Sequence, residues 1–289
     1  MKISRRKVPE HGQWPATISP VLQRIFASRG VTGPEQAELK LANLLSPDQL
    51  GGMDNAVDLL LSAIQAQKHI VIVGDFDCDG ATGTAVAMRG LKMLGADQLS
   101  YQVPHRIVHG YGLSPALVEH IVGIKPELII TVDNGIACHA GVAAAKAHGW
   151  QVLITDHHLP GEKLPPADAI VNPNLQGDGF PSKALSGVGV MFYLLLALRK
   201  KMRDLGILIQ PEPDLSSLLD LVAVGTVADL VSLDYNNRLL VSAGIKRFRK
   251  KQCQVGLKAL AEISGRDITK LVASDIGFAI GPRLNAAGR

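Results

Sequence analysis

The chain has 289 residues, of which 47% are hydrophobic and only 4% aromatic, and its formal net charge is +4. This length allows a large hydrophobic core, and the mild positive charge permits a polyanionic partner without requiring one. Cys78, Cys138 and Cys253 are far apart and form no CxxC pair, so we expect reduced thiols and a cytoplasmic protein. Residues 1–10 are charged and the most apolar stretch, residues 188–198, is too short to span a bilayer, so we expect no signal peptide and no membrane.

Helical patterns occupy the beginning of the chain. Residues 21–28, 34–45 and 54–67 carry apolar side chains that would share one face of a helix. These segments precede the first strong strand pattern. We therefore expect residues 1–68 to form a helical lead that covers an edge or a face of a sheet.

From residue 70 onward, strand and helix patterns alternate, which is typical of a parallel sheet with crossover helices. The predicted strands are residues 70–73, 99–103, 127–132, 151–155 and 169–171, and the predicted helices between them are residues 81–94, 115–122 and 137–148. Beyond a segment rich in proline and glycine, residues 159–181, the predicted helices are residues 189–203, 215–227, 236–249, 256–263 and 274–280. The sequence thus predicts an α/β fold with a five-stranded parallel sheet and a helical C-terminal part, as one unit over residues 69–289.

Three aspartates stand close together directly after the first predicted strand. Asp75, Asp77 and Asp79 lie in the sequence GDFDCDG, on a predicted strand-to-helix turn. Open α/β sheets bind ligands at the carboxyl ends of their strands. Carboxylates this close repel one another unless a cation or protons intervene, so the pattern indicates a metal site.

This acidic motif taken alone has other interpretations. An EF-hand loop starts in the same way, but its twelfth position would be a glutamate and here, counted from Asp75, it is Val86. An aspartyl nucleophile at a strand tip is a second possibility. Turn and capping aspartates are a third, although they would explain one of the three rather than all.

Further candidate groups follow two other predicted strands and one helix. Asp133 comes directly after residues 127–132, in VDNG, where a helix cap is an alternative role. Asp156, His157 and His158 follow residues 151–155, so a parallel sheet would gather them on the same edge. Asp229 ends an otherwise apolar helix, where a carboxylate must be paired, capping or coordinating.

These motifs together resemble a known superfamily. GDFDCDG, VDNG, DHH and GTVADL, in this order, are similar to the four motifs of the DHH phosphoesterases. VPHRIVHGYGL, LSGVGV, GPRLNAAGR and the lead-in LANLLSPDQLGGMDNAVDLLLSAI resemble the members of that superfamily that degrade single-stranded DNA from 5′ to 3′. The resemblance covers essentially the whole chain.

The resemblance implies a DHH catalytic domain with two Mn²⁺ or Mg²⁺ ions. The implied ligands are Asp75, Asp77, Asp79, Asp133, His157 and Asp229, with Asp133 as the bridging carboxylate. His158 would hydrogen-bond the scissile phosphate or the leaving oxygen, and Asp156 would orient an imidazole. The small pyrophosphatases of the superfamily have a histidine at the position of Val73, and in its exonucleases Asp75 takes that place.

The substrate implied is single-stranded DNA in repair and recombination, with proteins of those processes as possible partners. The expected nucleic-acid contacts are Arg106, Tyr111, Arg283, Asn285 and Arg289. A basic run at residues 246–251 is a further candidate for contacts with the DNA backbone. In the superfamily's exonucleases a second domain and a nucleic-acid-binding barrel follow this point, so we expect a catalytic core with reduced activity and processivity.

Two other functions stay open from the sequence. One is a phosphoesterase of the same superfamily that cleaves short oligonucleotides or cyclic dinucleotides. The other is a non-catalytic module that binds single strands.

Overall fold

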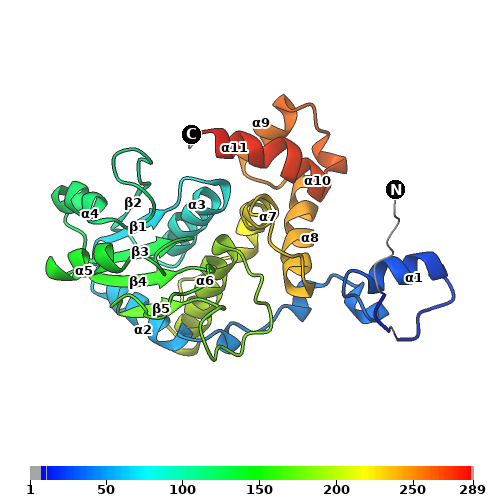
Figure 1. Cartoon of the computed structure of the whole chain (residues 1–289), viewed down its shortest axis with the longest axis horizontal. Helices are drawn as coiled ribbons and strands as arrows, with labels where there is room; N and C mark the ends of the chain where they lie inside the picture. The colour runs from blue at the N-terminus through cyan, green and yellow to red at the C-terminus, as the bar shows by residue number, and fades with distance from the viewer. Residues whose placement is uncertain (1–7, 11, 288–289) are drawn as a thin grey trace.

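A computed structural model describes residues 8–10 and 12–287, so Arg289 lies outside the described residues. Its centre is a sheet of five parallel strands in the order β2-β1-β3-β4-β5 (Figure 1). The strands are β1 (Ile70–Gly74), β2 (Leu99–Gln102), β3 (Leu128–Val132), β4 (Gln151–Thr155) and β5 (Ala169–Val171). The predicted fold class is confirmed, and each predicted strand agrees with the observed one to within one residue at either end.

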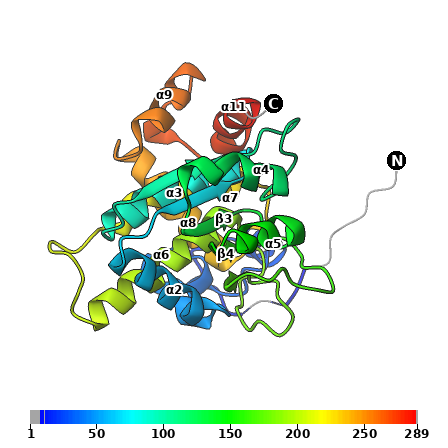
Figure 2. The same ribbon diagram turned by 90° about the vertical axis from the view of Figure 1, so that its left-hand side faces the viewer.

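Alternate residues of the buried strands face two different helical layers. Val71 and Val73 contribute to a core with α4 (Pro115–Ile121) and α5 (His139–Ala147). Ile70 and Ile72 contribute to a larger core on the opposite face, formed with helices α2, α3 and α6. Figure 2 shows the sheet between these layers. The bounds of the second layer are α2 (Met53–Gln65), α3 (Cys78–Met93) and α6 (Gly187–Asp204).

The strand order creates a switch point between β1 and β3. The chain passes from β1 through α3 to β2 on one face, and from β2 through α4 to β3 on the other. The connections therefore diverge at the carboxyl ends of β1 and β3. Such a switch point is where open α/β sheets bind ligands.

The remaining chain is helical, as predicted. Its elements are η5 (Leu215–Leu218), α7 (Leu219–Ala228), α8 (Tyr235–Arg249), α9 (Val255–Ile263), η6 (Ile268–Lys270), α10 (Ala273–Asp275), a π-helical turn η7 (Ile276–Ile280) and α11 (Gly281–Ala287). Helix α7 packs against both α3 and α8. The predicted helix over residues 274–280 continues through α11, so the GPRLNAA part of the last motif is helical.

The N-terminal segment differs from the prediction in one place. Helices α1 (Pro20–Ala27) and α2 match their predicted ranges, but residues 34–45 form only two short 3₁₀ turns, Pro34–Gln36 and Leu41–Asn43. A continuous helix here is wrong because the segment bonds to α8 instead. The Tyr235 hydroxyl donates to the Glu38 carbonyl at 3.3 Å, and the Leu45 N–H donates to Asn236 Oδ1 at 3.2 Å.

Over the ranges 8–10 and 12–287, no helix has the length and apolar character needed to cross a membrane.

Candidate metal centre

The first acidic motif is held by the beginning of α3. Asp77 is the N-cap of this helix, and its Oδ1 accepts a hydrogen bond from the Gly80 N–H at 2.9 Å. Asp75 directly follows β1, and its Oδ1 accepts from the Phe76 N–H at 2.7 Å. We predicted Asp79 on the strand-to-helix turn, but it lies within α3 itself, in the first turn of the helix. The helix starts at Cys78 rather than near residue 81.

Asp79 connects α3 to α6. Its Oδ2 accepts from the Gly187 N–H at 2.6 Å, and its Oδ1 accepts from the Val188 N–H at 3.0 Å. These donors belong to the first turn of α6, where main-chain N–H groups have no partner within the helix. The buried carboxylate is thereby fixed to a second element, which the sequence did not predict.

Asp133 lies at the end of β3 with a left-handed backbone, φ 62°. Among residues with a side chain, aspartate and asparagine adopt this conformation most readily. The Asp133 N–H donates to the Thr155 carbonyl at 3.1 Å, which ties the residue to β4. Helix α6 begins so close that a Cβ on Gly187 would lie 2.5 Å from the Asp133 Cβ, so only glycine fits there.

The DHH residues divide into a support and two imidazoles. Asp156 is buried, and its Oδ1 accepts from the His158 Nδ1–H at 2.7 Å and from the His157 N–H at 2.7 Å. Its Oδ2 accepts from the Ile136 N–H at 2.9 Å. Asp156 therefore orients His158, whereas His157 directs its Nε2 toward other carboxylates.

Nε2 of His157 lies among three carboxylates from three different elements. It is 3.1 Å from Asp133 Oδ1, 3.6 Å from Asp229 Oδ2 and 4.0 Å from Asp79 Oδ2. Asp229 is the C-cap residue of α7, so the last predicted ligand joins the others through the packing of α7 against α3.

The candidate ligands form three overlapping groups. In each group, one potential ligand atom per residue lies within 4.8 Å of the others. The groups are Asp75, Asp77 and Asp133; Asp79, His157 and Asp229; and Asp133, His157 and His158. Asp133 and His157 each belong to two of them, so these two side chains join the three groups into one cluster.

Burial and mutual repulsion make this cluster unfavourable without a cation. Burial raises the pKa of Asp75 to about 6. Burial, followed by repulsion from neighbouring carboxylates, also raises the pKa of Asp79 and Asp133 far above their usual values, and burial raises that of Asp229. Asp156 is the exception: burial opposes its ionisation, but hydrogen bonds from His158 and from main-chain N–H groups keep its pKa low.

The donor set fits a divalent cation. Within the described ranges, the buried atoms Asp133 Oδ1 and His157 Nε2 have no hydrogen-bond partner, although they face each other. A cation would satisfy both atoms and neutralise the surrounding carboxylates. Oxygen-rich ligands with an imidazole suit Mn²⁺ or Mg²⁺ better than a thiolate-bound metal. Cys78 does not take part: burial raises its pKa to about 12 and it packs in the hydrophobic core.

Two predicted nucleic-acid contacts lie beside the first acidic motif. The Arg106 guanidinium lies 4.1 Å above the ring of Phe76, and Tyr111 meets that ring edge-on with 6.0 Å between centroids. The Tyr111 hydroxyl donates to the Asp133 carbonyl at 3.3 Å. Phe76, which the sequence did not single out, thus joins the two side chains to the acidic site.

The predicted contacts of the last motif behave differently from one another. Asn285 accepts, through its Oδ1, a hydrogen bond of 2.7 Å from the Cys78 N–H, so α11 touches the start of α3. Arg283 donates to the Ala279 carbonyl at 2.6 Å and is otherwise exposed. In Figures 1 and 2, α11 and the loop between β2 and α4 lie on the same side of the molecule. Arg289 is outside the described residues.

Side chains of the basic run at residues 246–251 bond to the protein itself. Lys246, Arg247 and Arg249 donate to the carbonyls of Leu39, Gln252 and Leu271. Asp220 lies in the first turn of α7, and its Oδ2 accepts from the Gln254 N–H at 2.5 Å.

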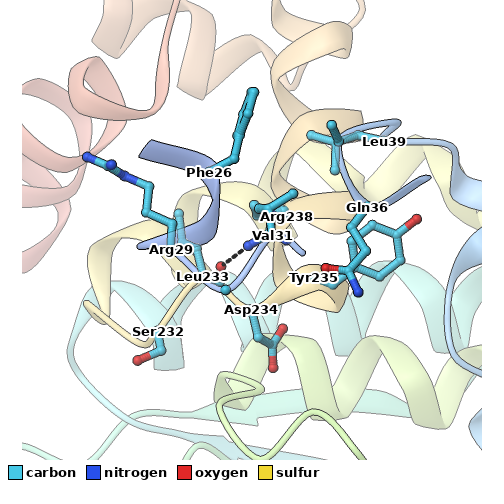
Figure 3. Close-up of a pocket in the computed structure, with 12 residues that line it drawn as sticks. Phe26, Arg29, Val31, Gln36, Leu39, Ser232, Leu233, Asp234, Tyr235 and Arg238 are labelled. Carbon is cyan, nitrogen blue, oxygen red and sulfur yellow. Dashed lines mark hydrogen bonds between the residues drawn. The ribbon is translucent and has the colours of Figure 1, made fainter. Parts of the chain in front are cut away.

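A cavity of about 830 Å³ lies apart from the acidic cluster, between the N-terminal segment and the start of α8 (Figure 3). Phe26, Val31 and Leu39 line one side of it and Leu233 and Arg238 the other. None of its lining residues is a predicted ligand.

Comparison with known proteins shows the family. A sequence model described as "DHH family, N-terminal domain" matches residues 69–226, more than half of the chain. The chain belongs to the DHH family. The matched range contains every predicted metal ligand of this DHH protein except Asp229, which follows it by three residues.

Several proteins similar to this chain are named RecJ. A protein of Salmonella typhimurium named "Single-stranded-DNA-specific exonuclease RecJ" is 53% identical over 292 residues, which cover 100% of this chain and 50% of that protein. A crystal structure of exonuclease RecJ bound to manganese matches with a TM-score of 0.72 and 39% identity, over 83% of this chain and 58% of that one.

A RecJ of Thermus thermophilus in complex with Mg²⁺ matches with a TM-score of 0.64 and 33% identity, over 91% of this chain and 32% of that one. The DHH chain spans about half the length of the curated relatives to which it is 50–53% identical.

Proposed function

We propose that this chain carries the catalytic centre of a metal-dependent exonuclease that hydrolyses single-stranded DNA from 5′ to 3′. The observation that carries the proposal is the convergence of Asp79, Asp133 and Asp229 on Nε2 of His157, where the buried atoms Asp133 Oδ1 and His157 Nε2 have no hydrogen-bond partner within the described residues and a cation would satisfy both. The similarity to proteins named RecJ, including structures bound to manganese and to Mg²⁺, supports the choice of substrate and metal.

Two Mn²⁺ or Mg²⁺ ions are the cofactors we propose. Asp75 and Asp77 would hold one, His157, Asp79 and Asp229 the other, and Asp133 both. Bound there, two cations supply an activated water and neutralise charge on the phosphodiester. This assignment includes Asp75, which lies in the same group as Asp77 and Asp133.

His158 would contact the scissile phosphate. Because its Nδ1 donates to Asp156, its Nε2 remains to face the substrate, and nearly half of its side chain is exposed. The hydrogen bond to Asp156 also raises the pKa of His158, which favours the protonated ring. A protonated Nε2 donates to a phosphate oxygen or to the leaving oxygen.

Arg106 and Tyr111 would hold the DNA strand next to the cluster. A guanidinium binds two phosphate oxygens at once, and the exposed half of the tyrosine ring can stack on a base. Arg283, Asn285 and Arg289 are proposed as further contacts from α11 and beyond. Asn285 has its side-chain carbonyl engaged with Cys78, so its amide group would make that contact.

The test compares matched substrates with Mn²⁺ and with EDTA. We expect mononucleotide release from a single strand labelled at its 5′ end, slower release from the same sequence as a blunt duplex, and none in EDTA. Short oligonucleotides degraded in preference to long ones would favour the small-substrate phosphoesterase. DNA binding without any cleavage by the unsubstituted chain, with cations bound, would contradict the proposal and favour a non-catalytic binding module.

We further propose that the protein works in the cytoplasm with repair or recombination proteins. The three free cysteines, which are well separated, support a reducing compartment.

A further inference from the structure

The two histidines of the DHH motif lie just beyond the end of a strand. The last residue of β4, Thr155, pairs with Val171 of β5, and the Asp156 N–H donates to the Val171 carbonyl at 3.1 Å. The main chain of His157 and His158 continues past this ladder. The position of both imidazoles therefore depends on what holds the backbone outside the sheet.

Two asparagines that follow β5 hold that backbone. Asn172 donates through Nδ2 to the His158 carbonyl at 2.9 Å, and Asn174 donates through Nδ2 to the His157 carbonyl at 2.6 Å. The Asn172 Oδ1 accepts from the Asn174 main-chain N–H at 2.8 Å, which ties the Asn172 side chain to the backbone of Asn174. Asn172 is completely buried.

The segment that carries these asparagines is itself fixed. Pro173 between them restricts its own φ and keeps Asn172 out of the helical region. Lys183 donates through Nζ to the Pro173 carbonyl at 2.6 Å and to the Asp178 carbonyl at 2.7 Å. The asparagines therefore act from a stiff support.

We propose that Asn172 and Asn174 are positioning residues of the metal centre, because each fixes the main chain of one DHH histidine. The inference rests on the proposed function. Holding the His157 carbonyl sets the direction of its Cα–Cβ bond, and so keeps Nε2 close to Asp133 and Asp229. Groups that orient metal ligands from outside typically change metal affinity by about 10- to 100-fold when removed.

The test uses Asn174→Ala, because this side chain is only partly buried and the change removes a single donor. We expect Mn²⁺ binding, measured by isothermal titration calorimetry, to weaken by about 10- to 100-fold. Asn174→Gln, which keeps an amide on a longer arm, should recover part of that affinity. The matched control is Asn43→Ala: Asn43 donates to the Tyr235 hydroxyl at 3.0 Å in the N-terminal segment, so its loss should leave Mn²⁺ affinity unchanged.

A second readout needs no metal. In the metal-free protein, the ¹⁵N signals of the His157 ring should shift in Asn174→Ala and stay in place in Asn43→Ala. Mn²⁺ affinity of a folded Asn174→Ala protein within about twofold of that of the unsubstituted chain would overturn the inference. If the unsubstituted chain binds no Mn²⁺, the proposed function fails by itself, and unchanged His157 signals in a folded Asn174 variant would then refute the positioning role. If Asn174→Ala does not fold, Asn174→Gln carries both measurements.

Discussion

At the scale of single residues, Asp133 is the carboxylate that we propose two cations share. It belongs to two of the three ligand groups, and its Oδ1 faces His157 Nε2 at 3.1 Å. Asp133→Asn keeps the shape and removes the charge that both ions would share. We expect it to weaken Mn²⁺ binding by more than about 100-fold, beyond the loss typical of an orienting residue, and to abolish nuclease activity.

The control for this substitution is Asp48→Asn. Asp48 is an exposed aspartate that is paired with Lys200 and belongs to none of the ligand groups. It should leave Mn²⁺ affinity and activity unchanged. Full two-ion binding by Asp133→Asn in calorimetry would contradict a shared carboxylate.

Protons compete with the cations for the same carboxylates. Because burial raises the pKa of Asp75 to about 6, and that of Asp79, Asp133 and Asp229 above their usual values, the metal-free site is partly protonated in weak acid. We therefore expect Mn²⁺ affinity to rise between about pH 5 and pH 7, with protons released on binding. Calorimetry in two buffers that differ in ionisation enthalpy measures both effects.

The same shifts set the stability of the metal-free chain. A raised pKa means that the folded chain binds these protons more tightly than the unfolded chain, so the free energy of unfolding falls as the pH rises from about 4 to about 6. The low pKa of Asp156 acts in the opposite direction. For metal binding, an Mn²⁺ affinity that stays constant or falls between about pH 5 and pH 7 would show that the carboxylates are already ionised before the metal binds.

The sequence predicted the charged candidate ligands at the strand ends, but it did not predict the uncharged residues that position them. Asp75, Asp133 and His157 follow apolar strands, and a parallel sheet gathers such ends. Asn172 and Asn174 follow β5 in the same way, but an asparagine beside a proline also occurs in ordinary turns, so its chemistry gave no signal. The role of Phe76 could not be predicted from the sequence either, because it depends on contact with Arg106, which lies in a distant loop.

At the scale of elements, the site depends on three helices that converge. The N-terminus of α6 binds the Asp79 carboxylate, and α7 brings Asp229 to it. Gly225 allows this approach: a Cβ there would collide with the Thr82 hydroxyl and lie 2.7 Å from both Asp79 Oδ1 and Val188 Cγ1.

Gly225→Ala tests the convergence. We expect it to lower the free energy of unfolding by about 1–3 kcal/mol, as overpacking does, and to weaken Mn²⁺ binding because Asp79 is displaced. Thermal unfolding and calorimetry measure these effects. The matched control is Gly256→Ala in α9, where a Cβ meets no atom within 4 Å and alanine favours the helix. Equal effects of the two substitutions would mean that the contact of α7 with α3 does not shape the site.

Elements were predictable where the pattern was local. The five strands and the helices around them follow from alternating apolar runs, and they match the structure. Residues 34–45 do not match the predicted helix, because the segment forms hydrogen bonds with Tyr235 and Asn236. A local sequence pattern cannot predict partners so distant in sequence. We predicted the start of α3 three residues too late. Asp77 was interpreted as a candidate ligand, but it is also the N-cap of the helix.

At the scale of the whole molecule, cations should stabilise the fold. The cluster joins β1, β3, β4, α3 and α7, so ions bound there favour the folded chain over the unfolded one. Mn²⁺ at about 100 times its dissociation constant should add about 2.7 kcal/mol, which corresponds to an increase of roughly 4–5 °C in the unfolding temperature of a chain of this length. Differential scanning calorimetry with Mn²⁺ and then with excess EDTA measures this. An unfolding temperature that changes with neither Mn²⁺ nor EDTA would contradict stabilisation by bound cations.

The most direct measurement is X-ray diffraction at the manganese absorption edge from a crystal of this chain soaked in Mn²⁺. We predict two anomalous peaks, roughly 3.5–4 Å apart as in other two-metal sites. One should lie against Asp75 and Asp77, the other against Asp79, His157 and Asp229, and both should lie against Asp133. An acidic cluster without manganese, in a crystal that takes up manganese elsewhere, would contradict the account.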